Sequence, residues 1–267
     1  MSDWLLNLPV PWMAALILAA IYAVTAAIHW SIMALAVGER ARAFKAISPG
    51  MLPPLSVIFA LLVAFLASQV WSEAERASSA VNREASALRA TVLLAGAFPG
   101  EPETHLRDLV RSYIQEAVSQ EWPAMARQGA TLTIAPAPLA EALALTLALS
   151  PHGDGQTVAQ REMTAALQTA LEARRQRIIL SRSSINWVKW SALLLLGGLT
   201  LVTIAMVHSD NRAANGIILA IFSSAIGVAV LLLAAHTRPF TGEISVSPGV
   251  LLQVMPEGEP APPPKAP

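Results

Sequence analysis

The sequence predicts an all-α membrane protein with four transmembrane helices and one helical domain outside the membrane. Three observations support this fold class. The 267 residues are 54% hydrophobic and only 13% charged, which leaves too little polar surface for a soluble protein of this length. Four apolar runs are each long enough to cross a hydrocarbon core of roughly 30 Å at about 1.5 Å per residue. A long polar stretch with helical periodicity, residues 72–186, separates the second run from the third.

The charge and cysteine content limit the functions that this fold can carry. The chain has 18 basic and 18 acidic side chains, and this balance gives no support for nucleic-acid binding, which needs a basic face. The chain contains no cysteine, so disulfides and thiolate metal sites are excluded.

The first apolar run covers residues 10–37 and predicts a retained membrane helix. It lacks the basic leader, the short apolar core and the small-residue cleavage site of a signal peptide. Gly38 ends this run, and residues 39–45 form a short basic connection. His29 lies within the run, where an ionisable side chain is a candidate functional residue. Its position beside Trp30, toward one end, favours an interfacial or interhelical hydrogen bond instead.

The second apolar run begins a helix that continues beyond the membrane. Residues 52–71 carry no charged side chain, and Pro53 and Pro54 lie in the first turn, where a missing backbone donor breaks no internal hydrogen bond. Residues 72–95 are polar, but no glycine or proline interrupts them before Gly96. We therefore expect one helix over 52–95, with its second part projecting into water.

The projecting part carries a narrow apolar stripe of mostly small side chains at steps of three and four residues. The stripe predicts the buried face of a helical domain and favours close helix packing over a ligand site. Its members are Ala74, Ala77, Val81, Ala85, Leu88, Val92 and Ala95.

The rest of the domain 72–186 also has helical periodicity. A helix is expected from Glu101 to a break near Trp122, and a second from about Pro138 to Leu149. Thr157 and Gln160 have the spacing of a capping box and predict the start of a third helix, which ends near Arg182.

The turn cluster 150–155 contains two side chains that are candidate metal ligands. His152 and Asp154 are far short of a coordination set. We therefore predict a solvated turn, and we expect no metal and no cofactor.

Two further membrane helices follow, at about 187–207 and 213–235. Residues 237–255 are expected to pack on the helical domain and can also form a short β-hairpin, since 243–246 alternates and a turn follows it. The proline-rich residues 256–267 lack core-forming side chains and predict a disordered tail.

Four spans place both termini and the domain on one side of the membrane. More Lys and Arg side chains lie near the span ends on the domain side than on the opposite side, which predicts a cytoplasmic domain. The domain side holds Arg76, Arg83, Arg174, Arg175, Arg177, Arg182, Lys189 and Arg238, and the opposite side holds Arg40, Arg42, Lys45 and Arg212.

Motifs of the common enzyme classes are missing from the sequence. It contains no nucleophile elbow, no His-Glu-x-x-His zinc motif, no phosphate-binding loop and no dinucleotide fingerprint, so we predict that the protein is not an enzyme. The second span instead has polar side chains among apolar ones and then a sharp change to charged residues. A pore can use such a surface as a narrow constriction followed by a charged vestibule. The polar and charged positions are Ser56, Ser68, Gln69, Glu73, Glu75 and Arg76.

Several motifs resemble the bestrophins. Residues 54–61, followed by Trp71 and the acidic-rich stretch 72–75, look like the second transmembrane helix of that family, and residues 239–242 look like its Pro-Phe-x-Gly segment. The topology is also similar. Residues 79–89, the triplet 121–123 and the run 238–242 resemble an uncharacterised bacterial family described as bestrophin-like, and this closer similarity covers nearly the whole chain.

This resemblance implies a homo-oligomeric, pentameric channel of the bacterial inner membrane, with the second helices lining a pore. Bestrophins usually pass monovalent anions such as chloride, although some bacterial relatives pass cations. Carried over to this sequence, the neck falls on Pro53, Val57 and Leu61, and their spacing of four independently places them on one helix face. The calcium-binding acidic cluster of the family is reduced to Glu243, so we predict no calcium gating.

Two hypotheses of different classes remain. The leading one is a channel in which Gln69, Glu73, Glu75 and Arg76 shape ion preference just beyond the neck. The alternative is a non-conducting membrane scaffold or sensor whose helical domain binds a protein partner. In the alternative, Val57 and Leu61 only pack against neighbouring helices.

Overall fold

The computed structural model describes residues 4, 8–45, 49–133 and 135–257, and within them it contains helices but no strand. The predicted all-helical fold class is confirmed. The contacts divide the chain into two compact units. The first unit combines residues 1–74 with 183–245, and the second combines 75–182 with 246–267.

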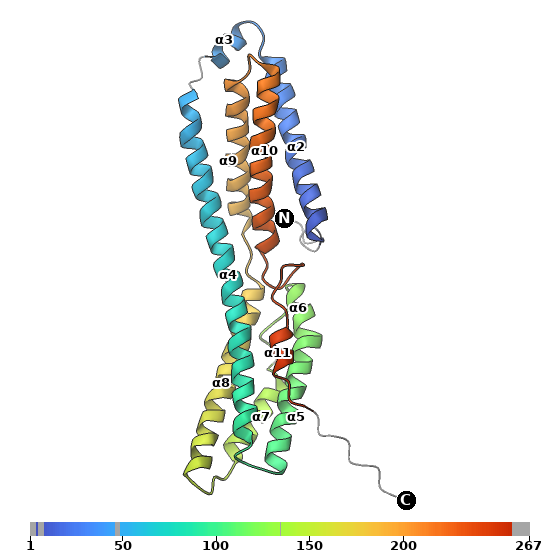
Figure 1. Ribbon diagram of the computed structural model, residues 1–267, viewed down its shortest axis with the longest axis vertical. Helices are drawn as coiled ribbons and strands as arrows, with labels where there is room; N and C mark the ends of the chain where they lie inside the picture. Colours follow the sequence, from blue (N-terminus) through green and yellow to red (C-terminus); the bar gives the residue numbers. More distant parts are fainter. Residues whose placement is uncertain (1–3, 5–7, 46–48, 134, 258–267) are drawn as a thin grey trace, which may run out of the picture. The chain divides into compact units, whose positions relative to one another are not determined.

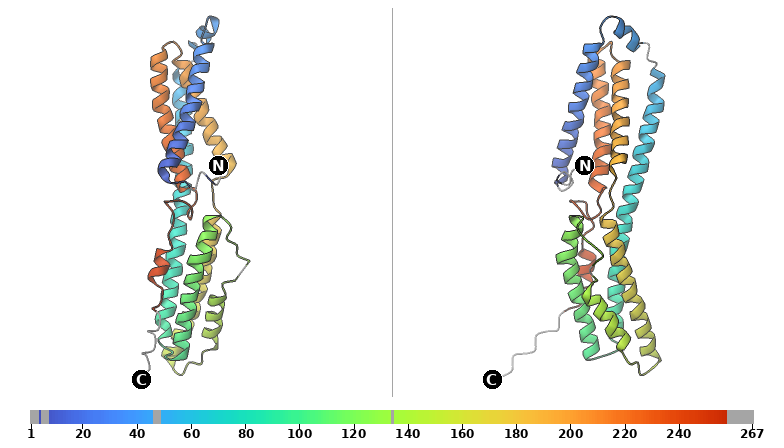
Figure 2. Two further views of the ribbon diagram at one scale, coloured as in Figure 1. Left: turned by 90° about the vertical axis from the view of Figure 1, so that its right-hand side faces the viewer. Right: turned by 180° about the vertical axis from the view of Figure 1, so that it is seen from behind.

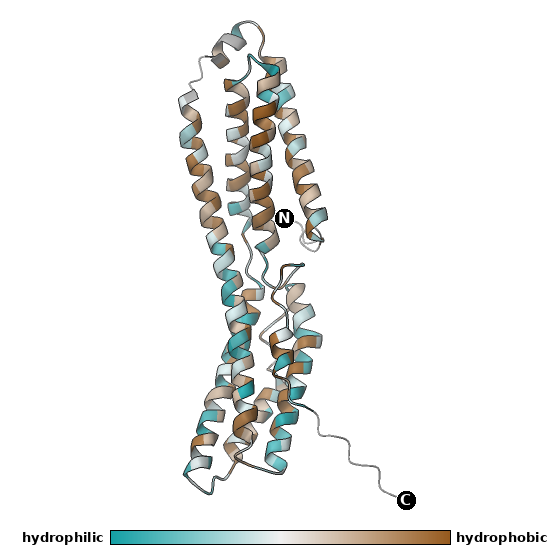
Figure 3. Cartoon of the chain, in the orientation of Figure 1, coloured by the Kyte–Doolittle hydropathy of each residue, from teal (hydrophilic) through white to brown (hydrophobic). Residues whose placement is uncertain are grey.

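The first unit contains the four helices that are long and apolar enough to cross a membrane. They are α2 (Val10–Leu35), the first part of α4 (Leu52–Ala95), α9 (Trp187–Val207) and α10 (Arg212–His236). Figure 3 shows that hydrophobic residues dominate these segments, whereas hydrophilic residues are frequent in the later part of α4. A short helix, α3 (Glu39–Lys45), and the 3-10 turn η1 (Pro49–Met51) lie between α2 and α4.

Helix α10 packs against both α2 and α9 in the first unit (Figure 1). The approach of α2 to α10 is close at Gly227, because a Cβ atom added there would lie 2.4 Å from Leu18 Cδ2. Such small residues let membrane helices approach each other.

Hydrogen bonds between short polar side chains join α2 to α10 in the first unit. Thr25 Oγ1 lies 2.6 Å from Ser223 Oγ, and His29 Nδ1 lies 2.8 Å from Asn215 Oδ1. Asn215 Nδ2 also donates to the carbonyl of Ala205 at 2.7 Å, which leaves its Oδ1 to accept from His29. The predicted interhelical hydrogen bond of His29 is therefore confirmed.

The second unit is a helical bundle. Helix α7 packs against both α5 and α8 (Figures 1 and 2). Its elements are the later part of α4, α5 (Glu101–Glu116), the π-helix η2 (Ala117–Glu121), α6 (Trp122–Ala126), α7 (Ala137–Ala148), α8 (Asp154–Ser181) and α11 (Gly249–Gln253).

The apolar stripe of α4 forms part of the core of the second unit. Ala77, Val81, Ala85, Leu88 and Ala95 are buried, whereas Ala74 and Val92 are half-buried. The predicted buried face is therefore confirmed. The same face also buries two polar side chains that the apolar pattern did not reveal, Glu84 and Thr91.

The predicted capping box at Thr157 and Gln160 is wrong. Helix α8 begins at Asp154, whose acidic side chain suits the first turn of a helix. Gln160 Nε2 donates to the carbonyls of Thr146 and Leu149, at 2.9 and 2.8 Å. It caps carbonyl groups at the end of α7, where the Thr146 carbonyl also accepts from the Leu149 amide at 3.4 Å.

The β-hairpin considered near the C-terminus is also wrong. Residues 243–246 form no strand, and Gly249–Gln253 is a short helix that buries Leu251. An isolated two-stranded hairpin is only marginally stable in water, and the short helix is held in place by the burial of Leu251.

The C-terminal segment 237–255 is divided between the two units after Ser245. In the first unit, Thr237 Oγ1 accepts from the Ile185 amide at 3.3 Å, and the Glu243 carboxylate accepts from the Val10 amide at 3.2 Å. The predicted disordered tail 256–267 lies, beyond Glu257, outside the described residues.

Candidate pore-lining surface and buried ion-pair network

One face of α4 carries an unbroken line of exposed side chains at steps of three and four residues. This spacing places them along one side of an α-helix. We call this set the exposed line of α4. It is apolar at its start and polar or charged further on. Its members are Pro53, Val57, Leu61, Ala64, Ser68, Trp71, Glu75, Ser79, Asn82, Ser86, Arg89 and Leu93.

All three predicted neck residues lie on the exposed line. Val57 is 56% exposed and Leu61 is 52% exposed. Phe59 and Leu66, on the opposite side of the helix, are buried in the first unit. Within the single chain, the neck side chains are therefore available to a surface outside the core.

The predicted vestibule residues do not form one group. Glu75 lies on the exposed line, and Arg76 is exposed beside it. Gln69 and Glu73 are half-buried on another side of α4, where Lys189 Nζ donates to Gln69 Oε1 at 2.5 Å and Gln69 Nε2 donates to Glu73 Oε1 at 2.8 Å. The sequence shows all four residues within two turns, but not which of them face outward.

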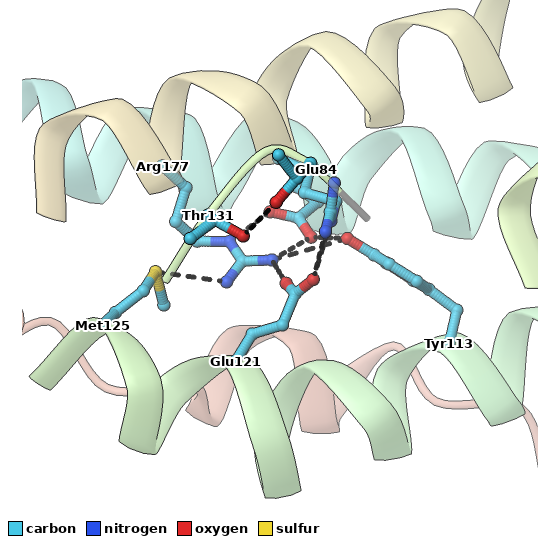
Figure 4. A network of polar contacts seen from close by, with 8 residues as sticks. Glu84, Tyr113, Glu121, Met125, Thr131 and Arg177 are labelled. Atoms are coloured by element: carbon cyan, nitrogen blue, oxygen red, sulfur yellow. Dashed lines mark hydrogen bonds and ion pairs between the residues drawn. The ribbon is translucent and has the colours of Figure 1, made fainter. Parts of the chain in front are cut away.

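A buried ion-pair network lies behind the exposed line in the second unit (Figure 4). Arg177 on α8 and Glu84 on α4 both have fully buried side chains. Arg177 Nε and Nη2 donate to the two carboxylate oxygens of Glu84, at 2.8 and 3.0 Å. The Tyr113 hydroxyl on α5 donates to Glu84 as well. Such a two-pronged guanidinium–carboxylate pair is strong and geometrically specific.

Glu121 supplies the second carboxylate of the network. Its Oε2 accepts from Arg177 Nη2 at 2.9 Å, and its Oε1 accepts from Arg174 Nε at 2.8 Å. The Arg177 guanidinium also lies 4.5 Å from the centre of the Trp122 ring. Two carboxylates and two guanidinium groups balance in charge, as groups buried away from water require.

The π-helix η2 explains how Glu121 reaches this network. At roughly 100° per residue, eight residues of regular α-helix would turn Glu121 about 80° away from Tyr113. The wider π turn over Ala117–Glu121 takes up one extra residue, which brings the two side chains to nearly the same face. Pro123 accounts for the wide turn, since a proline ring clashes with the carbonyl four residues earlier in an α-helix.

The surroundings shift two pKa values in the network. Burial raises the pKa of Tyr113 well above its ordinary value, and the nearby Glu84 carboxylate raises it further. Burial alone would lower the pKa of Arg177, but the attraction of Glu84 outweighs it and the pKa rises. The tyrosine therefore keeps its proton and the arginine keeps its charge.

A cavity of about 330 Å³ lies next to the network, and both Glu121 and Arg174 line it. Across the described part of the chain, no three His, Cys, Asp or Glu side chains are grouped as a metal site requires. His152 and Asp154 are both exposed at the start of α8.

The chain matches the model of the bestrophin-like domain family over residues 19–251. The chain belongs to the bestrophin-like family. Together with the four apolar helices, this membership identifies a membrane protein. No sequence among curated proteins matches the chain.

Solved structures support the fold of this bestrophin-like protein. Two single-mutant crystal structures of a bacterial bestrophin homologue from Klebsiella pneumoniae match it with TM-scores of 0.70 and 0.69, at 13% and 12% sequence identity. Each match covers 91% of this chain, and 97% or 96% of the other. At this identity, the similarity shows the fold.

Two motifs of the bestrophin-like resemblance meet in the ion-pair network. Residues 79–89 contain Glu84, and the triplet 121–123 supplies Glu121, Trp122 and the proline. Sequence reasoning missed Glu84 and Arg177 as partners. One signal was present, because Glu84 lies four residues before Leu88 and therefore on the apolar stripe.

Proposed function

We propose that this bestrophin-like protein is an oligomeric ion channel whose α4 helices line a central pore. The main observation that supports the proposal is the exposed line of α4. It joins an apolar segment in a membrane helix to a polar segment outside it, while the opposite side of the helix is buried. One helix face cannot enclose a pore, so several copies around an axis are needed, and the family resemblance favours five.

The apolar part of the line fits a hydrophobic neck formed by Pro53, Val57 and Leu61. The part beyond the membrane fits a charged vestibule. The exposed line itself carries one charge of each sign, Glu75 and Arg89. Arg76 and Arg83 are exposed one residue to its side, so three of the four exposed charged side chains of α4 are basic. This excess of positive charge favours monovalent anions, because a positively charged surface raises the local concentration of negatively charged ions.

The proposed setting is the bacterial inner membrane, with both termini and the second unit in the cytoplasm. The larger number of Lys and Arg side chains near the span ends on that side supports this orientation.

The test is the current across a planar bilayer that contains the purified protein under a KCl gradient. We expect a reproducible current whose reversal potential lies near the chloride equilibrium potential. Val57→Ala and Leu61→Ala should raise the conductance, because smaller side chains widen the neck. Silence of the inserted wild type and of both neck variants would contradict the channel and favour a scaffold that binds a protein partner.

Ile58→Ala is the matched control for the neck. Ile58 is as exposed as Val57 but lies one residue to the side of the line. Its truncation should leave the conductance unchanged. An equal effect of Ile58→Ala and Val57→Ala would argue against a pore along this face.

A second pair of variants tests the vestibule. Glu75→Gln should move the reversal potential toward stronger anion preference, and Arg89→Gln should move it the opposite way. Glu73→Gln removes the same charge two residues from Glu75, but Glu73 is turned toward Gln69. It should therefore have a much smaller effect on the reversal potential.

A further inference from the structure

The buried carboxylate of Glu84 lies on the side of α4 opposite to the exposed line. Asn82 and Ser86, which belong to that line, are each two residues from Glu84. At roughly 100° per residue, Glu84 points almost directly away from them. Whatever holds Glu84 in place therefore also decides which side chains of α4 face outward.

The small side chains of this part of α4 define its rotation only weakly, and Val81 and Leu88 are the larger apolar side chains that it buries. Four of its buried side chains are alanines, and three of its six exposed side chains are serines of similar size. A rotated helix could bury one small set in place of the other at little cost in packing. The two sets are Ala77, Ala80, Ala85 and Ala87, which are buried, and Ser78, Ser79 and Ser86, which are exposed.

The charged partners of Glu84 do not allow such an exchange. Turning α4 by one residue would place either Arg83 or Ala85 against Arg177. Arg83 would bring a like charge to a fully buried guanidinium, and Ala85 would leave that guanidinium without its main partner. Both alternatives are strongly unfavourable. The pair therefore favours one rotation of α4 and disfavours the rotations that differ from it by one residue.

We propose that Glu84 and Arg177, supported by Glu121, are positioning residues that fix the rotation of α4 and thereby hold the line from Glu75 to Arg89 outward. Glu84 is on α4, and three other elements hold it in place. Arg177 on α8 and Tyr113 on α5 contact Glu84 directly, and Glu121 of the π-helix η2 contacts Arg177. The consequence for conduction rests on the proposed channel, whereas the positioning role stands without it.

The cysteine-free sequence allows a direct test by single-cysteine labelling. Ser86→Cys reports the exposed line, and Ala87→Cys reports the buried face next to it. A charged thiol reagent should modify the thiol at position 86 at least about ten-fold faster than the thiol at position 87, because reaction requires an accessible thiolate.

Adding Glu84→Gln should reduce this ratio toward one, with a slower reaction at position 86 and a faster one at position 87. General loosening of the unit would speed up both reactions, so the opposite changes distinguish rotation from destabilisation. Glu116→Gln removes an exposed carboxylate of α5 outside the network and should leave the ratio unchanged. A folded Glu84→Gln protein with an unchanged ratio would overturn the proposal.

If Glu84→Gln does not fold, the double variant Glu84→Met with Arg177→Met takes its place. Replacing both partners by apolar side chains of similar size preserves burial better than leaving one charge alone. In the double variant, the ratio of the labelling rates at positions 86 and 87 should also fall toward one, and an unchanged ratio would overturn the proposal.

Bilayer recordings then separate this inference from the proposed function. With a conducting wild type, Glu84→Gln should alter conductance while Glu116→Gln does not. A changed labelling ratio in a protein that never conducts would leave the positioning role intact and contradict only the channel.

Discussion

In the first unit, hydrogen bonds between short polar side chains join α2 to α10, whereas in the second unit full charges join α4, α8 and the π-helix η2. Thr25 with Ser223 and His29 with Asn215 are examples of the first kind. Glu84 with Arg177 is the example of the second. In lipid, neutral pairs and small residues supply modest attraction. In water, apolar burial supplies the stability, and a buried ion pair can instead select one arrangement among several.

The largest effect should come from breaking the charged pair on one side. Arg177→Ala leaves Glu84 buried without its main partner and should lower the free energy of unfolding by about 3–5 kcal/mol. Arg175→Ala, at an exposed position two residues away, should change it by less than about 0.5 kcal/mol. Thermal unfolding in detergent measures both, and equal effects would show that the network contributes nothing specific.

Removing the Tyr113 hydroxyl should have a smaller effect that depends on pH. Tyr113→Phe deletes a hydrogen bond to a charged acceptor and should cost about 1.5–3 kcal/mol near neutral pH. Because the pKa of Tyr113 is raised in the folded protein, the unfolded chain loses this proton first, at a pH of about 10. The stabilisation by Tyr113 is therefore complete below that pH and is lost above it.

The measurement is the difference in free energy of unfolding between wild type and Tyr113→Phe across this pH range. We expect the difference to shrink as the pH rises above about 10. A constant difference would contradict the raised pKa.

In the first unit, the close approach of α2 to α10 should be the most sensitive feature. Gly227→Ala places a Cβ atom against Leu18 and should destabilise the unit by about 1–3 kcal/mol. Leu18→Ala in the same chain should recover part of that loss. Gly198→Ala meets no atom within 4 Å and favours the helix, so it should be neutral or stabilising.

The smallest effect should be that of a neutral pair within the first unit. A double-mutant cycle of Thr25→Val and Ser223→Ala should give a coupling energy of about 0.6 kcal/mol. A coupling as large as the loss in Arg177→Ala would remove the contrast between the two units.

The long elements could be predicted from the sequence, because length, hydropathy and helical period determine them locally. The continuous helix 52–95 and its apolar stripe are of this kind. The wrong predictions concern side chains whose partners lie on neighbouring helices. Thr157 and Gln160 have the spacing of a cap, but Gln160 serves the end of α7. That contact cannot be read from spacing.

The partners in the ion-pair network lay beyond sequence reasoning for the same reason. Four arginines lie near the end of α8, and only contacts with distant helices decide that Arg177 is the one fully buried. For Glu121, the π turn alters the helical phase on which any periodicity argument depends. The exposed line of α4 needed the structure as well, because contacts with α9 decide that Gln69 and Glu73 are turned inward whereas Glu75 is exposed.

The π turn over Ala117–Glu121 also marks a place where the chain length can change. A π turn accommodates one more residue than an α turn while keeping the helix in phase on both sides. Deletion of Ser119, together with Pro123→Ala to remove the proline clash, should give a regular α-helix that still presents Tyr113 and Glu121 to Arg177. Most single-residue deletions within a packed helix shift every contact beyond them by about 100°. Here the helix should tolerate the loss, and natural relatives of different length can differ at this turn without losing the ion pair.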